Sequence, residues 1–128
     1  PTGKSVITSK LFASAILEHL PRPEKTVQLI KQVLKPKGEL IVTLPNIAHW
    51  RMRWNLLLGR WDYEDYGILD RTHLRFYTYF TCQKLIEGAG FKIKTILIDP
   101  AGGMKYFDWL VSRWPNLYAH QICIYAQK

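Results

Sequence analysis

The run Leu40-Ile-Val-Thr-Leu44 is the feature that most limits what this chain can fold into. Successive apolar or β-branched residues without strict alternation predict a strand buried on both faces, as in parallel sheets covered by helices. Pro45 ends the strand because it has no N–H to donate to a neighbouring strand. Ligands of open α/β sheets bind beyond the carboxyl ends of the strands, so Asn46 is predicted to lie at a binding site.

A helix and an earlier strand are predicted before this run. Apolar residues recur at helical spacing over residues 23–34, and Pro23 suits the first helical position, where its missing N–H costs nothing. The sequence Lys35-Pro-Lys-Gly38 ends that helix. The short apolar run at residues 11–13 predicts the earlier strand. A strand–helix–strand order implies a parallel pair joined by a right-handed crossover.

Further helices and strands follow in the second half of the chain. Residues 60–79 are rich in aromatic and charged side chains and have weak periodicity, so residues 47–79 are expected to form a lid-like insertion. The other expected elements are a helix at 47–58 ended by Gly59, a helix N-capped by Thr81 and closed by Gly88 or Gly90, a strand at 91–98, a loop at 99–103, a short helix at 104–114 and a last strand at 119–126.

Composition limits the class of protein and its partners. With 128 residues, of which 48% are hydrophobic, the chain is expected to form one ordered domain over residues 1–128. The net charge of +8 favours an anionic partner or serves only solubility. Cys82 and Cys123 match no metal or redox spacing, no metal ligands are predicted, and reduced thiols indicate a cytoplasmic protein. No apolar run approaches the roughly 20 residues that span a bilayer.

Four segments carry motifs in an order that is familiar from one family. They are Ser-Ala-Ile-Leu-Glu-His-Leu at 14–20, Leu-Lys-Pro-Lys-Gly-Glu-Leu-Ile-Val-Thr-Leu-Pro-Asn at 34–46, Leu-Asp-Arg-Thr-His-Leu-Arg-Phe-Tyr-Thr at 69–78 and Glu-Gly-Ala-Gly-Phe at 87–91. From about residue 11 onward the chain resembles the class I S-adenosylmethionine-dependent methyltransferases, in the branch with many small-molecule and glycan-associated enzymes. The resemblance implies the C-terminal half of that fold: a partial Rossmann-like, three-layer α/β arrangement of about four strands, the last one antiparallel.

The chain also departs from the family pattern. The family's Gly-rich loop after the first strand and the acidic residue that ends the second have no counterpart, so only half of the fold is expected. Ser9, followed by Lys10, stands where the family often has an acidic residue at the start of the fourth strand. The usual Pro-Gly-Gly turn reads Pro-Lys-Gly, which predicts a strained positive φ at Lys37.

The resemblance implies S-adenosylmethionine as the cofactor. In the family, the loop after the fourth strand passes close to the sulfonium and the amino-acid end of this cofactor. The residues that match that loop here are Ser14, Ala15, Ile16, Glu18 and His19. For His19, an ordering role in the turn is the favoured alternative to cofactor binding.

Candidate catalytic and substrate-binding residues lie in or beside the lid-like insertion. Methyl transfer depends mostly on positioning, but an oxygen acceptor also needs a base within hydrogen-bond reach. His49 and His73 are the candidate bases, with a structural role as the alternative for each. Asn46, Arg71 and Arg75 are the candidate substrate-binding residues, because the arginines alternate with His73 and could clamp a phosphate or carboxylate. In the alternative, neighbouring acids neutralise the arginines, namely Asp62, Glu64, Asp65 and Asp70.

The sequence therefore predicts a methyltransferase fragment that moves a methyl group to a small acceptor, with an anionic acceptor as one option. A non-catalytic binding or assembly module derived from a methyltransferase is the alternative. Nucleic-acid binding through the aromatic residues and arginines of 50–66 is a third, disfavoured because acids lie among and just after them. A bare hydrophobic sheet edge near residues 11–14 predicts a homodimer, with or without swapped elements, or else an insoluble or partner-dependent monomer.

Overall fold

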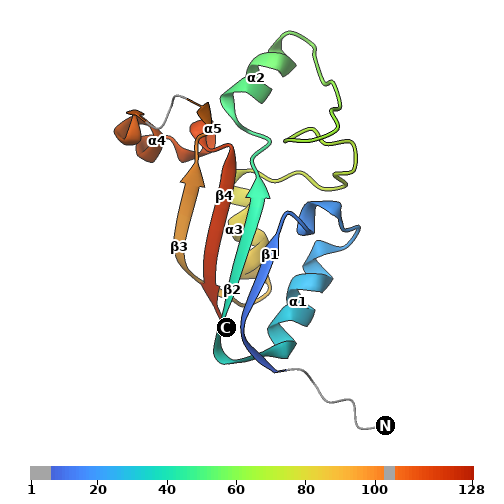
Figure 1. Cartoon of the computed structure of the whole chain (residues 1–128), viewed down its shortest axis with the longest axis vertical. Helices are drawn as coiled ribbons and strands as arrows, with labels where there is room; N and C mark the ends of the chain where they lie inside the picture. The colour runs from blue at the N-terminus through green and yellow to red at the C-terminus, as the bar shows by residue number, and fades with distance from the viewer. Residues whose placement is uncertain (1–6, 103–105) are drawn as a thin grey trace.

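The structure is a computed structural model that describes residues 7–102 and 106–128. In these residues four strands form one mixed sheet in the order β1-β2-β4-β3 (Figure 1). Strand β1 (Thr8–Ser14) pairs in parallel with β2 (Leu34–Pro45), and β4 (Gln121–Gln127) is antiparallel both to β2 and to β3 (Lys92–Asp99). The predicted α/β class, with about four strands and an antiparallel last strand, is confirmed.

Helices fill the connections between these strands. The 3-10 turn η1 (Leu17–His19) and helix α1 (Pro23–Val33) join β1 to β2, and α3 (Tyr79–Gly88) precedes β3. Helix α2 (Trp50–Leu57) stands beyond the carboxyl end of β2 (Figure 1). Two short helices, α4 (Asp108–Arg113) and α5 (Pro115–Tyr118), lie between β3 and β4. The predicted helix at 104–114 and the end of the predicted loop at 99–103 fall partly on residues 103–105, outside the described ones.

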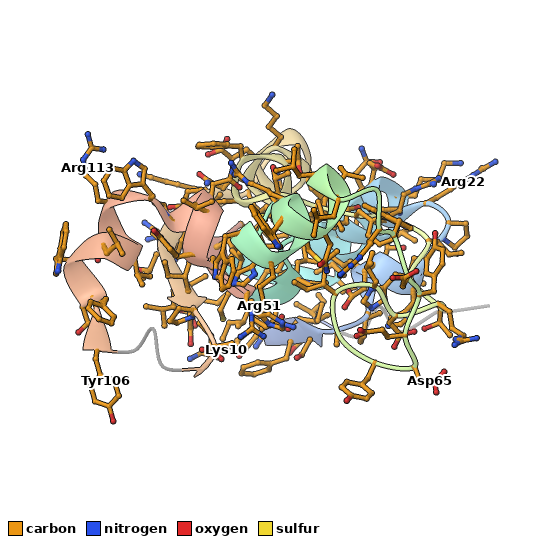
Figure 2. The ribbon with its side chains drawn as sticks, turned by 90° about the horizontal axis from the view of Figure 1, so that it is seen from above. Lys10, Arg22, Arg51, Asp65, Tyr106 and Arg113 are labelled. Atoms are coloured by element: carbon orange, nitrogen blue, oxygen red, sulfur yellow. The ribbon has the colours of Figure 1, made fainter. Side chains whose placement is uncertain are left out.

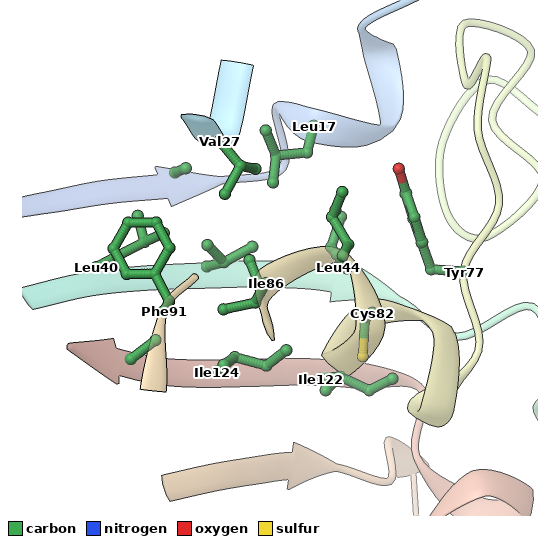
Figure 3. Close-up of a cluster of buried hydrophobic side chains, with 14 of the residues drawn as sticks. Leu17, Val27, Leu40, Leu44, Tyr77, Cys82, Ile86, Phe91, Ile122 and Ile124 are labelled. Carbon is green, nitrogen blue, oxygen red and sulfur yellow. The ribbon is translucent and has the colours of Figure 1, made fainter. Parts of the chain in front are cut away.

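The core lies between one face of the sheet and helices α1 and α3 (Figure 3). Leu40, Val42 and Leu44 of β2 point into it, whereas Ile41 and Thr43 between them are only half-buried. The prediction that β2 is buried on both faces is therefore wrong for the described chain. The reason is that α1 and α3 contact each other and share one core, and a second helical layer is not found in residues 7–102 and 106–128.

Two element boundaries differ from the prediction because local side chains fix them. The N-cap of α3 is Thr78, not Thr81: the Thr78 hydroxyl accepts the Thr81 N–H, and the Thr81 hydroxyl accepts the Thr78 N–H. Thr81 thus closes a capping box in which the usual Glu or Gln is replaced by Thr. Helix α2 begins at Trp50 instead of residue 47, since His49 is its N-cap. Helix α5 was not predicted.

Lys37 adopts the positive φ that the Pro-Lys-Gly turn predicts, with a value of 63°. A side chain in this region is strained by about 1–2 kcal/mol. Helix α1 passes directly into β2 at Leu34, so the chain must reverse within a few residues, and this geometry imposes the strain. None of the described helices has the length and apolar character needed to span a bilayer.

Candidate functional site

The predicted site residues gather beyond the carboxyl ends of β1 and β2. There α2 and the irregular chain after it form a lid segment, residues 47–78, whose far end returns to β2 through the Ile47 N–H bond to Tyr77 O at 2.9 Å. Figure 2 looks down on this end of the molecule: Arg51 of α2 lies near the middle and Asp65 at the outer edge of the lid segment. The lid segment therefore covers the carboxyl ends of the strands, which is where α/β proteins bind ligands.

The loop that follows β1 is exposed and strained. Ser14, Ala15 and Ile16 are all exposed, and Ala15 has a φ of 51°. The Thr43 hydroxyl holds the loop: its oxygen accepts the Ala15 N–H at 3.2 Å and lies 2.8 Å from the Ser14 hydroxyl oxygen. Backbone strain of this kind persists only where the surroundings enforce it, and it clusters at ligand-binding sites. The structure thus brings the first three predicted cofactor residues together in one open loop.

Glu18 and His19 turn away from that loop toward the lid segment. The Glu18 side chain is 2% exposed, and its backbone carbonyl accepts the N–H groups of Leu74 and Arg75 at 2.7 and 3.1 Å. The His19 ring nitrogen Nδ1 lies 3.2 Å from Thr72 O. Both residues therefore tie η1 to residues 72–75, and cofactor binding by their side chains stays a prediction.

Asn46 is fully buried, and its side chain makes bonds inside the protein. Its Nδ2 donates to Asn116 O at 2.9 Å and to Ala119 O at 2.8 Å, while its Oδ1 accepts the Ala48 N–H at 3.0 Å. These bonds fasten the end of β2 to the connection between α5 and β4. The geometry explains Asn46 as a positioning residue, and substrate contact remains a prediction.

His49 is buried, with 2% of its surface exposed, and caps α2 by accepting the Arg51 N–H at Nδ1 over 3.3 Å. Burial, and to a smaller extent the nearby His120 and Arg51, lower the pKa of His49 from 6.5 to about 4, against a smaller raising effect of the Pro100 backbone. The ring is therefore neutral near pH 7, with its proton on Nε2 because Nδ1 accepts a bond. Nε2 has no hydrogen-bond partner among the described residues. In this geometry His49 offers a hydrogen-bond donor, and its role as a base stays a prediction.

A cavity of about 380 Å³ opens next to His49, between α2 and the middle of the lid segment. Apolar side chains, among them Met52, Ile68 and Leu69, form part of its wall. Its polar lining comes from His49, Arg51, Asn55, Asp62, Glu64 and His120. The mixture of charges and apolar wall is what a small polar ligand needs for orientation.

The alternating residues at 71–75 do not converge into an anion clamp. Arg71 Nε pairs with Asp65 Oδ1 at 3.0 Å, with both side chains exposed. Arg75 Nη2 donates to Pro21 O at 2.8 Å, and His73 Nδ1 lies 3.0 Å from Ile68 O with its side chain 6% exposed. None of the three lines the 380 Å³ cavity. Arg71 is thus paired with a neighbouring acid, which is the alternative that the sequence left open. A substrate contact by Arg71 or Arg75 stays a prediction.

Sequence reasoning missed Thr43, Thr72 and His120. Thr43 was detectable, because it is the polar residue in the otherwise apolar run 40–44, and its hydroxyl organises the loop after β1. The contacts of Thr72 with His19 and of His120 with His49 gave no local signal, since the partners lie far away in the sequence.

The sequence profile of the family described as "Methyltransferase domain" matches residues 11–96, which is more than half of the 128-residue chain. The chain belongs to this methyltransferase-domain family. The match includes the second half of β1, all of β2 and the lid segment, and most of β3. The cofactor that the fold implies is S-adenosylmethionine, as the sequence resemblance predicts. A search of curated proteins gave no match.

Solved methyltransferases share the fold at low sequence identity. A SAM-dependent methyltransferase from Archaeoglobus fulgidus is 16% identical with a TM-score of 0.65, and covers 96% of this chain and 60% of its own. A possible histamine N-methyltransferase from Thermotoga maritima is 15% identical with a TM-score of 0.64, covering 94% and 56%. Phosphoethanolamine N-methyltransferase 2 from Haemonchus contortus, solved with S-adenosyl-L-methionine, is 14% identical with a TM-score of 0.58, covering 94% and 33%. The methyltransferase domain described here thus spans 60% or less of the length of these structures.

Proposed function

We propose that this chain is part of an S-adenosylmethionine-dependent methyltransferase that transfers a methyl group to a small acceptor. The observation that carries the proposal is the exposed, strained loop of Ser14, Ala15 and Ile16 at the carboxyl end of β1. It occurs in a chain whose residues 11–96 match the methyltransferase-domain family. The 380 Å³ cavity, in which an acceptor would lie, is also beyond the carboxyl ends of the strands.

The residues present fit one end of the cofactor. The open loop at 14–16 suits the methionine moiety, because its backbone groups are exposed and Thr43 fixes their orientation. When bound, the cofactor supplies an electrophilic methyl group on a sulfonium. The chain's own contribution would be to hold the loop, to exclude water with the lid segment, and to orient the acceptor against it.

The acceptor is proposed to be small and polar. An anionic group on it would pair with Arg51 but would also face Asp62 and Glu64, which line the same cavity. Arg71 and Arg75 are engaged elsewhere. His49 lines the cavity, and its Nε2–H has no bond to any described residue. This N–H would orient an acceptor that displaces the atoms now packed over it. The predicted base His73 lies outside this cavity, so the proposal gives it no part in proton transfer there.

Calorimetric titration of the chain with S-adenosylhomocysteine tests the proposal. We expect saturable one-to-one binding. Thr43→Val removes the hydroxyl that holds Ser14 and Ala15 and should weaken binding about fivefold to tenfold, the effect of losing roughly one hydrogen bond. Thr95→Val is the matched control, because Thr95 is exposed on β3, away from the loop. Absence of heat at high ligand concentration would contradict cofactor binding by this chain.

We also propose that the chain forms a homodimer through the edge strand β1. The protein is proposed to be cytoplasmic. β1 is one of the two edge strands of the sheet, and its Phe12 side chain is 66% exposed. Unpaired edge strands with exposed apolar side chains invite pairing with another chain. This surface is also what favours the alternative of an assembly module. Light scattering should give a dimer mass that Phe12→Lys lowers, while Thr95→Lys leaves it unchanged; a monomer mass for the original chain would overturn the proposal.

A further inference from the structure

We infer that Glu18, His19 and His73 form a binding site for a divalent transition-metal ion, with zinc as the best match. One ligand atom of each lies within 4.8 Å of the other two, and within residues 7–102 and 106–128 no other such group is found. Glu18 and His19 come from η1 and His73 from the lid segment, 54 positions further along the chain. The site therefore bridges two elements and lies outside the cavity beside His49.

His73 presents the correct ring nitrogen for a metal. Its Nδ1 lies 3.0 Å from the carbonyl oxygen of Ile68, and a carbonyl only accepts, so Nδ1 carries the proton. Nε2 is then left with its lone pair, 3.9 Å from Glu18 Oε1. That distance is too long for a hydrogen bond. Metal-binding histidines characteristically donate their second ring N–H to a backbone carbonyl in this way.

His19 is oriented in the same manner by a chain of bonds. Its Nδ1 lies 3.2 Å from Thr72 O and 3.1 Å from Thr72 Oγ1. The Thr72 hydroxyl donates to Asp70 Oδ1 at 2.5 Å, so its proton is already committed. Nδ1 must therefore be the donor to Thr72, which leaves a lone pair on Nε2 of His19 as well. Both histidines are thus held in the tautomer that binds a metal through Nε2.

Glu18 supplies the negative charge. Its side chain is 2% exposed, and its Oε2 has no hydrogen-bond partner among the described residues. A buried carboxylate oxygen without a partner is costly, and a bound cation would remove that cost. One carboxylate oxygen and two imidazole nitrogens suit zinc or a neighbouring first-row metal, whereas magnesium and calcium prefer all-oxygen sites.

The distances require a small closure on binding. Zinc bonds of about 2.0–2.1 Å place tetrahedral ligand atoms about 3.3 Å apart. The separation of 3.9 Å between His73 Nε2 and Glu18 Oε1 would shorten by roughly that difference. Since the Glu18 carbonyl already accepts the N–H groups of Leu74 and Arg75, the metal would reinforce an existing junction between η1 and the lid segment.

Titration of the full 128-residue chain with zinc chloride in a non-chelating buffer tests this inference. We expect one zinc per chain, with much weaker binding of magnesium. His19→Ala and His73→Ala should each weaken zinc binding by at least about tenfold, as loss of a ligand costs no less than loss of its orienting partner. His120→Ala is the matched control and should leave zinc affinity unchanged, since His120 lies outside the cluster. Equal zinc affinity in all three variants would overturn the inference.

A second measurement does not depend on whether the variants fold. In the unmodified chain, nitrogen NMR should show that zinc shifts the Nε2 signals of His19 and His73 while their Nδ1 atoms remain protonated. The signals of His49 and His120 should not move. Zinc-induced shifts confined to His120, or none at all, would overturn the inference. Because neither experiment uses S-adenosylhomocysteine, failure here is separate from failure of the proposed methyltransferase function.

Discussion

Replacing Asn46 with alanine is expected to lower the free energy of unfolding by about 3 kcal/mol, since each buried group left without its partner costs roughly 1–3 kcal/mol. The change removes the bonds to Asn116 O, Ala119 O and the Ala48 N–H. Ala119 is fully buried, so its carbonyl gains no water in compensation, while Asn116 is half-buried and recovers part of the loss.

Urea denaturation followed by circular dichroism measures this effect. Asn55→Ala is the matched control: Asn55 is half-buried on α2, and its side chain makes no hydrogen bond to a described residue. We expect that control to change the free energy of unfolding by about 0.5 kcal/mol or less. Asn46→Asp should destabilise at least as much as Asn46→Ala, because it keeps the acceptor for Ala48 but turns a carboxylate oxygen toward two carbonyls. Equal stability of Asn46→Ala and Asn55→Ala would show that this network does not hold the sheet edge.

The elements of the fold were predictable wherever the signal is local. Pro23 at a helix start, the apolar stripe of α1 and the proline that ends β2 are each read within a few residues, and the structure has them. The strained Lys37 followed from one turn motif. By contrast, burial of β2 on both faces was inferred from an apolar run, and a run does not tell which helices cover which face.

The candidate site was predictable in its loop and not in its contacts. Ser14, Ala15 and Ile16 form one exposed loop because they are consecutive at a strand end. The bonds of Asn46 to residues 116 and 119 and the approach of His73 to Glu18 join positions more than 50 apart. No periodicity encodes such pairs. The proposed metal-binding site, which joins η1 to the lid segment, therefore has no spacing motif in the sequence.

For Arg71 and Arg75, the sequence pattern suggested a shared direction that the structure does not have. Alternation at 71–75 suggested that Arg71 and Arg75 face one side, which holds only if the segment is an extended strand. The described chain there is irregular instead, and Leu74 and Arg75 donate their N–H groups to Glu18 O. The two guanidinium groups therefore reach different partners, Asp65 and Pro21 O. A surface pair such as Arg71 with Asp65 adds little stability.

Acidification is expected to destabilise the chain through His49. Its pKa is lowered from 6.5 to about 4, chiefly by burial, so the unfolded chain binds a proton over a pH range in which the folded chain does not. Stability from this group is therefore complete above about pH 6.5 and is lost as the pH falls toward 4. A shift of this size corresponds to about 3 kcal/mol at most. We expect about 2 kcal/mol, because partial opening at low pH lets water reach the ring.

The free energy of unfolding, measured between pH 7 and pH 4 for the original chain and for His49→Asn, isolates this contribution. Asparagine keeps an acceptor for the Arg51 N–H at the N-cap but has no titratable ring. The variant should therefore lose less stability on acidification by about 2 kcal/mol, while carboxylates elsewhere affect both proteins alike. Identical pH slopes would mean that His49 takes up its proton within the folded state. That proton would go to Nδ1, since Nε2 already carries one, and the ring could then no longer accept the Arg51 N–H as the N-cap of α2.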